Sequence, residues 1–267
     1  MTLSKIKTYK KLNQPKYRHQ LDLALAEGIN SVENIIRFCP EAIREVYCDE
    51  ANQQIIQRIS SLTKLNKYPF YYVSRDKIDR ISKNTGGVLV IFKVTKLQTK
   101  MAQRLDDMIV QPLQNKTVLV LYNISDPGNL GTIIRAAAAF GVNKIFLTSN
   151  SVDEFNPKVI RASAGTIFFM PIIRCEINPL IKSLQTSNYC ILAAALNSKA
   201  TKLNKADLQY QKTAFIFGSE AHGLPINILN NVNKIIYIPI QQSVESLNLA
   251  GSVYAILSLK QFLTFNS

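Results

Sequence analysis

The sequence predicts an α/β protein whose second half contains a mainly parallel sheet. Short apolar, β-branched runs such as residues 118–122 (VLVLY) and 144–148 (KIFLT) have the length and composition of fully buried strands. Helical patterns separate these runs, as expected where helices cover both faces of a parallel sheet. Further strands are predicted at residues 189–194, 214–217 and 234–239, and a last helix at residues 247–263.

Residues 1–97 are predicted to form a separate, smaller α/β domain. Apolar side chains between His19 and Cys39 recur at helical spacing and predict one helical stretch there. Other predicted elements are strands at 45–48, 70–73 and 87–94 and helices near 53–61 and 75–82. Residues 98–116 are mixed and polar, and we interpret them as a connector with one or two helical turns. The second domain is therefore expected to span residues 117–267.

The net charge of +14, from 32 Lys/Arg against 18 Asp/Glu, favours a polyanionic partner. Nucleic acid is the first candidate and an anionic membrane surface the second. The first 18 residues carry Lys5, Lys7, Lys10, Lys11, Lys16 and Arg18 and no acid. Taken alone, this run fits a solvated, frayed terminus as well as an RNA-binding segment. The excess of cations across residues 1–100 favours RNA.

Cysteine usage and hydropathy disfavour several other classes of protein. The four cysteines are Cys39, Cys48, Cys175 and Cys190, and none forms a C-x-x-C pair. A zinc site is disfavoured, and no metal is expected. Reduced thiols and the lack of an apolar run of roughly 18–20 residues lead us to expect a cytoplasmic protein without a membrane segment.

Three loops that follow predicted strands carry the polar residues of interest. They are residues 126–135, 217–225 and 238–250, and ligands of parallel sheets bind in such loops. We expect Asn129 to cap the helix after the first loop and Ser246 to cap the last helix. In the second loop, Gly218 and Gly223 bracket Glu220, a carboxylate that suits a cationic ligand such as a sulfonium better than an anion. Each loop alone fits an ordinary turn, whereas three in order are stronger evidence.

The motifs in these loops resemble a known family. The patterns are Asn129-x-Gly131-x3-Arg135, Gly218-Ser219-Glu220-x2-Gly223-Leu224 and Glu245-Ser246-Leu247-Asn248-x-Ala250. In this order they resemble the three motifs of the SpoU (TrmH-like) ribose methyltransferases of the SPOUT superfamily. Residues 156–165 are similar to the family's segment between the first two motifs. Residues 16–18, 26–28 and 86–89 resemble parts of the small RNA-binding domain that many members carry.

The resemblance implies a fold, a reaction and a set of site residues. It implies a C-terminal α/β-knot domain with a trefoil knot, which composition and periodicity do not show. It also implies a homodimer with a shared active site that moves a methyl group from S-adenosylmethionine to a ribose 2′-hydroxyl. By the same resemblance, the catalytic residues are Arg135, Asn129, Glu220, Ser246 and Asn248, and the cofactor-binding residues are Gly218, Ile238, Leu247, Leu196 and Asn197.

The role of Arg135 stays open between two alternatives. A guanidinium is effectively always protonated, so Arg135 is either an unusual base or a group that orients and stabilises the developing alkoxide. His222 occupies a place where small or charged residues are more usual in the family; we interpret it as a solvent-facing loop residue and assign it no role.

Three other functions compete with an rRNA methyltransferase. The first two, a transfer-RNA 2′-O-methyltransferase and a non-catalytic RNA-binding protein of the same fold, share the resemblance. The large-subunit (23S) ribosomal RNA is favoured because the chain has a separate RNA-binding half. The third, a nucleotide-dependent dehydrogenase, is disfavoured because the loop after residues 118–122 lacks G-x-G-x-x-G spacing.

Overall fold

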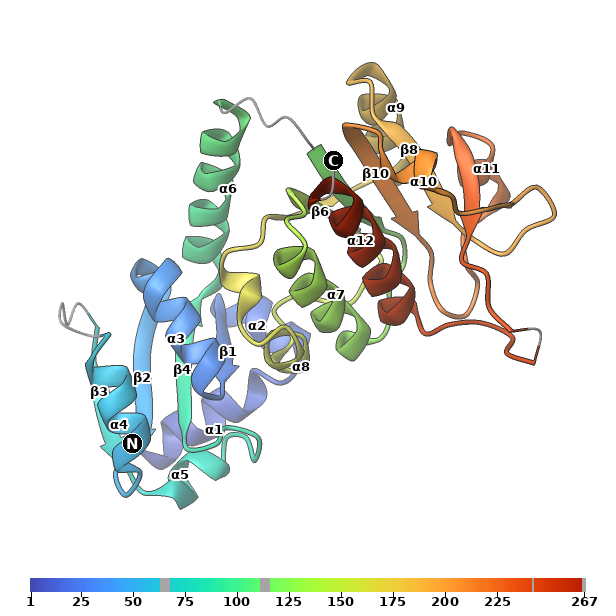
Figure 1. Cartoon of the computed structure of the whole chain (residues 1–267). Coiled ribbons are helices and arrows are strands. Elements are labelled where there is room, and N and C mark those ends of the chain that lie inside the picture. Colours follow the sequence, from blue (N-terminus) through green and yellow to red (C-terminus); the bar gives the residue numbers. More distant parts are fainter. Residues whose placement is uncertain (63–67, 111–115, 242, 266–267) are drawn as a thin grey trace. The chain divides into compact units, whose positions relative to one another are not determined.

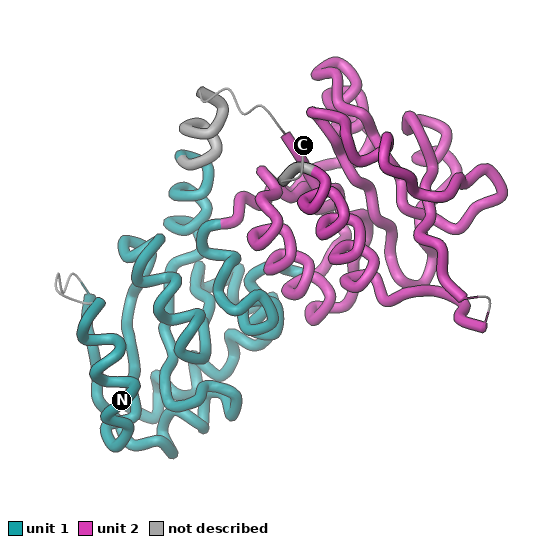
Figure 2. The backbone as a smooth tube through the Cα atoms, in the orientation of Figure 1, with its two compact units in different colours: residues 1–108, 153–169 teal, residues 109–152, 170–267 magenta. Residues whose placement is uncertain are grey.

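The computed structural model describes residues 1–62, 68–110, 116–241 and 243–265. Two compact units make up the chain (Figure 2). Unit 1 comprises residues 1–108 and 153–169, and unit 2 comprises residues 109–152 and 170–267. Residues 153–169 therefore belong to unit 1, although the segments before and after them belong to unit 2.

Unit 1 is built on a four-stranded sheet of order β1-β4-β2-β3. β4 is antiparallel to β1 and to β2, and β3 is parallel to β2 at the edge (Figure 1). Its elements up to β4 are α1 (Leu3–Lys11), α2 (Pro15–Leu21), β1 (Leu23–Glu27), α3 (Ile29–Phe38), the 3₁₀ helix η1 (Pro40–Ala42), β2 (Ile43–Asp49), α4 (Gln53–Ser60), β3 (Phe70–Val73), α5 (Arg75–Asp79) and β4 (Val88–Lys93). One core cluster joins α1 and the segment 78–81 to one face of this sheet.

The single helical stretch predicted between His19 and Cys39 is wrong. α2 ends at Leu21, where Asp22 adopts a left-handed conformation with φ of 52°. The five residues of β1 are all buried and pair with β4, and Gly28, with φ of 83°, leads into α3. Ala, Leu and Glu are good helix formers, but pairing in the sheet overrides that local preference.

The segment 153–169 is fixed in unit 1 by two ion pairs, each with one buried partner, and by close packing. It contains α8 (Pro157–Ala162) and the 3₁₀ helix η2 (Thr166–Phe168). Arg18 is 2% exposed and binds Asp153 at 2.5 Å, while Arg161 pairs with the buried Glu27. A Cβ on Gly165 would lie 2.7 Å from the Cα of Ser31, so only glycine allows this close approach. Arg18 is thus an anchored residue, not part of a frayed terminus.

The expected connector at 98–116 is largely helical. α6 runs from Val94 to Val110 as one helix of 17 residues, longer than the one or two turns predicted. Its apolar residues Leu97 and Met101, four positions apart, are buried on one side of the helix. Residues 111–115 of the predicted connector lie outside the described residues.

Unit 2 contains a seven-stranded sheet of order β7-β6-β5-β10-β8-β11-β9. Every described pair in it is parallel, which confirms the predicted α/β class with a mainly parallel sheet. Its elements are β5 (Lys116–Leu121), α7 (Pro127–Ala139), β6 (Lys144–Thr148), β7 (Ile172–Cys175), α9 (Ile177–Thr186), β8 (Cys190–Ala194), β9 (Thr201–Lys202), α10 (Lys205–Leu208), β10 (Lys212–Phe217), α11 (Ile226–Leu229), β11 (Lys234–Tyr237) and α12 (Leu249–Phe265).

The central strands of unit 2 are buried on both faces. α9 and α11 contribute Leu184 and Ile228 to a cluster with alternate strand residues such as Val120 and Ile216. The intervening residues, Phe215 among them, point to the opposite face, because side chains alternate along a strand. α7 and α12 lie side by side in unit 2 (Figure 1). This arrangement brings the first turns of both helices to the carboxyl end of the sheet.

Candidate active site

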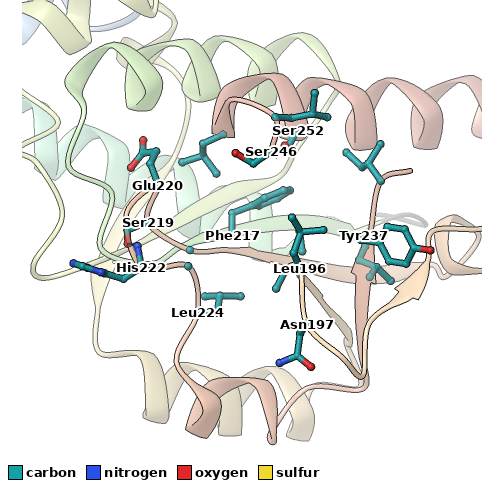
Figure 3. A pocket seen from close by; sticks show the side chains of 18 of the residues that line it. Leu196, Asn197, Phe217, Ser219, Glu220, His222, Leu224, Tyr237, Ser246 and Ser252 are labelled. Carbon is teal, nitrogen blue, oxygen red and sulfur yellow. Dashed lines mark hydrogen bonds between the residues drawn. The ribbon is translucent and has the colours of Figure 1, made fainter. Parts of the chain in front are cut away.

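A cavity of about 530 Å³ lies at the carboxyl ends of β8, β10 and β11 in unit 2. Leu196 and Asn197 follow β8, Gly218 follows β10, Ile238 follows β11, and Leu247 precedes α12. The structure therefore brings together all five residues predicted to bind the cofactor. Figure 3 shows Leu196, Asn197 and Tyr237 on one side of this cavity and Glu220 on the other.

The loop after β10 has its shape because two glycines fold it back on itself. A Cβ on Gly218 would lie 2.3 Å from the carbonyl carbon and oxygen of Gly223, closer than backbone atoms allow. Gly223 has φ of 61°, and its N–H donates to the carbonyl oxygen of Ser219 at 2.9 Å. The tight loop leaves the side chains of Ser219, Glu220 and His222 at the cavity.

Three of the five predicted catalytic residues form a hydrogen-bonded chain. Asn129 Nδ2 donates to Glu220 Oε1 at 2.6 Å, and Asn129 Oδ1 accepts from Asn248 Nδ2 at 3.0 Å. Glu220 and Asn248 line the cavity, whereas Asn129 lies on α7 behind them. Because both polar ends of Asn129 are engaged, the carboxylate and the second amide are held in a fixed relative position.

The helix caps differ from those that the sequence suggested. α7 begins at Pro127, and Asp126 caps it by accepting from the N–H of Asn129 at 2.7 Å. α12 begins at Leu249, and Asn248 Oδ1 accepts from the N–H of Gly251 at 3.2 Å. Asp126 therefore takes the cap predicted for Asn129, and Asn248 the cap predicted for Ser246. An earlier cap on α7 leaves the Asn129 side chain available to Glu220.

The two remaining predicted catalytic residues lie in different places. Ser246 is exposed and lines the cavity near Ser252 (Figure 3). Arg135 is exposed on α7 and is not among the residues that line the cavity. Among the described residues it has no hydrogen-bond or ion-pair partner. A single copy of the chain thus does not bring Arg135 to the other predicted catalytic residues.

Sequence reasoning missed several residues of the cavity. Phe217 and Tyr237 are the last residues of β10 and β11, and both line it. Ser252 also lines it, two residues after the end of the third motif. The rule that ligands bind at the carboxyl ends of parallel strands would have selected the two aromatic residues.

Within the described ranges, no group of three or more His, Cys, Asp or Glu side chains is placed to hold a metal ion. No helix in the same residues has the length and apolar character needed to cross a bilayer.

A family model settles the relationship suggested by the three loops. The model described as the SpoU rRNA Methylase family matches residues 116–258, more than half of the chain. The chain belongs to this SpoU family. A second model, described as RNA 2′-O ribose methyltransferase substrate binding, matches residues 25–99. This SpoU protein is therefore an RNA 2′-O-methyltransferase, and S-adenosylmethionine is its methyl donor.

Individual relatives agree with this assignment. The chain is 26% identical to the 23S rRNA (guanosine(2553)-2′-O)-methyltransferase RlmP of Bacillus subtilis, over 92% of this chain and 91% of that protein. It is 41% identical to an uncharacterized tRNA/rRNA methyltransferase of Synechocystis, but it spans 50% of that relative. An AdoMet-bound rRNA methyltransferase structure from Sinorhizobium meliloti has a TM-score of 0.79 at 23% identity, covering 98% of this chain and 96% of that one, which shows the same fold.

Proposed function

We propose that this SpoU methyltransferase methylates the ribose 2′-hydroxyl of a nucleotide in 23S ribosomal RNA, with guanosine as the favoured acceptor. The Asn248–Asn129–Glu220 chain at the edge of a 530 Å³ cavity carries the proposal. It sets fixed polar groups beside a space large enough for a nucleoside cofactor. The 23S target and the guanosine come from the name of the B. subtilis relative, which aligns over nearly the whole chain.

The cavity fits S-adenosylmethionine by the chemistry of its walls. Leu196, Ile238 and Leu247 provide apolar surface, and Gly218 lines the same cavity. We propose that these residues and Asn197 hold the adenosine part of the cofactor. When bound, the cofactor supplies an electrophilic methyl group on a positively charged sulfur.

The side chains of the hydrogen-bonded chain orient the two reactants in this proposal. Asn129 donates to one oxygen of Glu220, so the other oxygen remains to accept from the ribose or to face the sulfonium. Asn248 donates to Asn129 Oδ1 and so holds the Asn129 side chain in place, and the exposed Ser246 hydroxyl contributes a further polar contact. Such positioning accelerates a reaction because it holds the reacting groups in line at the moment of transfer.

Arg135 has its role at the acceptor. It binds the phosphate of the target nucleotide and stabilises the negative charge that develops on the ribose 2′-oxygen. Its exposure outside the cavity suits a site completed by a second copy of the chain. We therefore include a homodimer in the proposal. Leu259 and Phe262, which are 48% and 66% exposed on α12, provide apolar surface for such an interface.

Unit 1 binds the RNA in this proposal. Lys7, Lys10, Lys11 and Lys16 are exposed on or next to α1 and α2, and phosphates are the ligands that such a group of cations attracts. The family model for substrate binding covers residues 25–99 of the same unit. A ribosomal substrate also places the protein in the cytoplasm. The trefoil knot of unit 2 and the boundaries of the domains at 97 and 117 stay predictions.

Methyl transfer to RNA tests the proposal directly. The purified protein is incubated with labelled S-adenosylmethionine and unmodified ribosomal and transfer RNA, and the digested nucleosides are identified. We expect 2′-O-methylguanosine from the 23S fraction. Label in transfer RNA alone, or a base-methylated product, would contradict the proposed substrate or reaction.

Arg135→Ala should abolish transfer and leave the Kd for S-adenosylmethionine nearly unchanged, because the arginine acts on the acceptor. A large increase in that Kd would contradict its assignment.

A further inference from the structure

A second cavity, of about 320 Å³, adjoins the first in unit 2. Its lining combines the loop after β5 with the loop after β10 and includes Tyr122, Asn123 and Ser125. Ser219 and His222 line both cavities, so the loop 219–223 lies between them, and we call it the partition loop. Figure 3 shows the His222 side chain directed away from Leu196 and Asn197, the residues at the far side of the first cavity.

The second cavity has the chemistry of a site for a flat heteroaromatic ring. Tyr122 and His222 both line the cavity, and aromatic rings are the side chains on which a flat heterocycle stacks. A volume near the small end of ligand pockets, which run from roughly 300 Å³ upward, suits one base and not a whole cofactor. His222 and Ser125 are exposed, so a group carried on a chain can enter from solvent.

The side chain of Asn123 is held in place and has a donor group that can bind the edge of such a ring. Its backbone is left-handed, with φ of 53°, and its N–H donates to Thr148 Oγ1 at 2.9 Å. The hydroxyl of Thr148 donates in turn to Asn123 Oδ1 at 3.1 Å, which fixes the carboxamide. Within the described residues the Nδ2 group has no hydrogen-bond acceptor, so its two hydrogens remain available to a ligand.

We propose that the second cavity receives the base of the acceptor nucleotide, flipped out of the RNA. His222 and Tyr122 stack on the base, and Asn123 Nδ2 donates to a carbonyl or ring nitrogen at its edge. The ribose of the same nucleotide then lies at the partition loop, which carries Glu220. His222 therefore positions the acceptor and Asn123 gives specificity, whereas the sequence analysis assigned His222 no role. This inference rests on the proposed methyl transfer to RNA.

Three variants at two positions separate stacking from edge recognition. His222→Ala removes the ring, whereas His222→Phe keeps an aromatic face. Asn123→Asp keeps the acceptor oxygen for Thr148 Oγ1 and tolerates the left-handed backbone, but it replaces the Nδ2 donor with an acceptor. His19→Ala is the matched control, since His19 is the other histidine of the chain and is exposed on α2.

The experiment compares two RNA oligonucleotides that differ only at the acceptor position, which is first mapped in the wild-type product. One carries the natural nucleotide, and the other carries an abasic ribose with its 2′-hydroxyl intact. For His222→Ala we expect kcat/KM on the natural RNA to fall roughly 5- to 150-fold, the range for loss of one stacked base. Asn123→Asp should also lower kcat/KM on the natural RNA, because an acceptor replaces the donor at the edge of the base. On the abasic RNA, kcat/KM should stay within twofold of the wild type. His222→Phe should keep most of the activity, and the Kd for S-adenosylmethionine should stay unchanged in Asn123→Asp, because Asn123 lines the second cavity and not the first.

The ratio of the two substrates decides the outcome. Equal losses on natural and abasic RNA, or no loss on either, would overturn the base site while methyl transfer by the wild type still upholds the proposed function. Any effect of His19→Ala should be the same on both RNAs, because that residue is outside the cavity. A wild type that methylates neither RNA would overturn the proposed function and the base site with it.

Discussion

Asn129→Asp tests the hydrogen-bonded chain with the smallest change of shape. The substitution exchanges an amide for a carboxylate, so the Nδ2 donor 2.6 Å from Glu220 Oε1 becomes an acceptor oxygen. The other oxygen still accepts from Asn248 Nδ2. Only the contact with Glu220 changes from attraction to repulsion.

The size of the effect follows from that contact. A hydrogen bond to a charged acceptor contributes about 1.5–3 kcal/mol. Two like charges at this separation, screened as in water, add roughly 1.6 kcal/mol of repulsion. Restoring the wild-type position of Glu220 in the variant therefore costs about 3–4.5 kcal/mol, which predicts a fall in kcat/KM of roughly 150- to 2000-fold.

The same substitution should hardly change the stability of the fold. Glu220 is exposed, so water can replace the lost hydrogen bond once the two carboxylates move apart. Position 129 also lies in the first turn of α7, where a negative charge is favourable. We expect the free energy of unfolding to change by less than about 1 kcal/mol.

The assay is methyl transfer to 23S RNA, with thermal unfolding of the same samples. Asn178→Asp is the matched control, because Asn178 is an exposed asparagine in the first turn of α9 in the same unit. It should leave kcat/KM within about twofold of the wild type. Full activity of Asn129→Asp, or a loss of activity explained by unfolding, would refute the positioning role of Asn129.

Three further predictions test other parts of the molecule. Asn248→Asp keeps the cap on α12 but loses the donor to Asn129, so the melting temperature should hold while transfer falls at least about fivefold; unchanged transfer would remove Asn248 from the chain. Gly218→Ala should raise the Kd for S-adenosylmethionine more than about tenfold by calorimetry, because the added Cβ meets backbone at 2.3 Å; an unchanged Kd would mean the loop yields freely. Burial raises the pKa of the Glu45 carboxyl, but hydrogen bonds from Lys5, Tyr47 and Tyr9 outweigh it and bring the pKa below 4.5. The contribution of ionised Glu45 to the stability of the fold is therefore fully present above the carboxyl's ordinary pKa, and it is lost as the pH falls through the lowered pKa. Glu45→Gln should flatten the acid side of a profile of melting temperature against pH, and an unaltered profile would contradict this.

The strands of the parallel sheet could be predicted from sequence because their local pattern and their environment agree. Residues 118–121 are apolar and β-branched, and the sheet buries them on both faces, so every level of structure favours the same state. β1 shows the opposite case. Leu23–Glu27 reads as helix by composition, and only its pairing with β4, more than 60 residues later, makes it a strand. No local sequence pattern within β1 indicates that β4 is its partner.

The candidate site was partly predictable for a related reason. The three loops follow strands, and that order alone indicates ligand-binding positions. Which loops meet depends on the strand order, and β5 pairs with β10 although 90 residues separate them. The sequence suggested Asn129 and Ser246 as caps because both types favour that position, but Asp126 and Asn248 compete for the same N–H groups and are better placed.

The strand order explains why Asn129 can form hydrogen bonds with residues from both of the other motif loops. β5 and β10 are neighbours, which sets the loop carrying Asn129 beside the loop carrying Glu220. α12 packs along α7, which brings the cap of α12 to the same point. One amide therefore joins the ends of two strands and the start of the last helix. A shift of any of these elements changes the position of Glu220, so we infer that the packing of α12 on α7 controls where this carboxylate lies during methyl transfer.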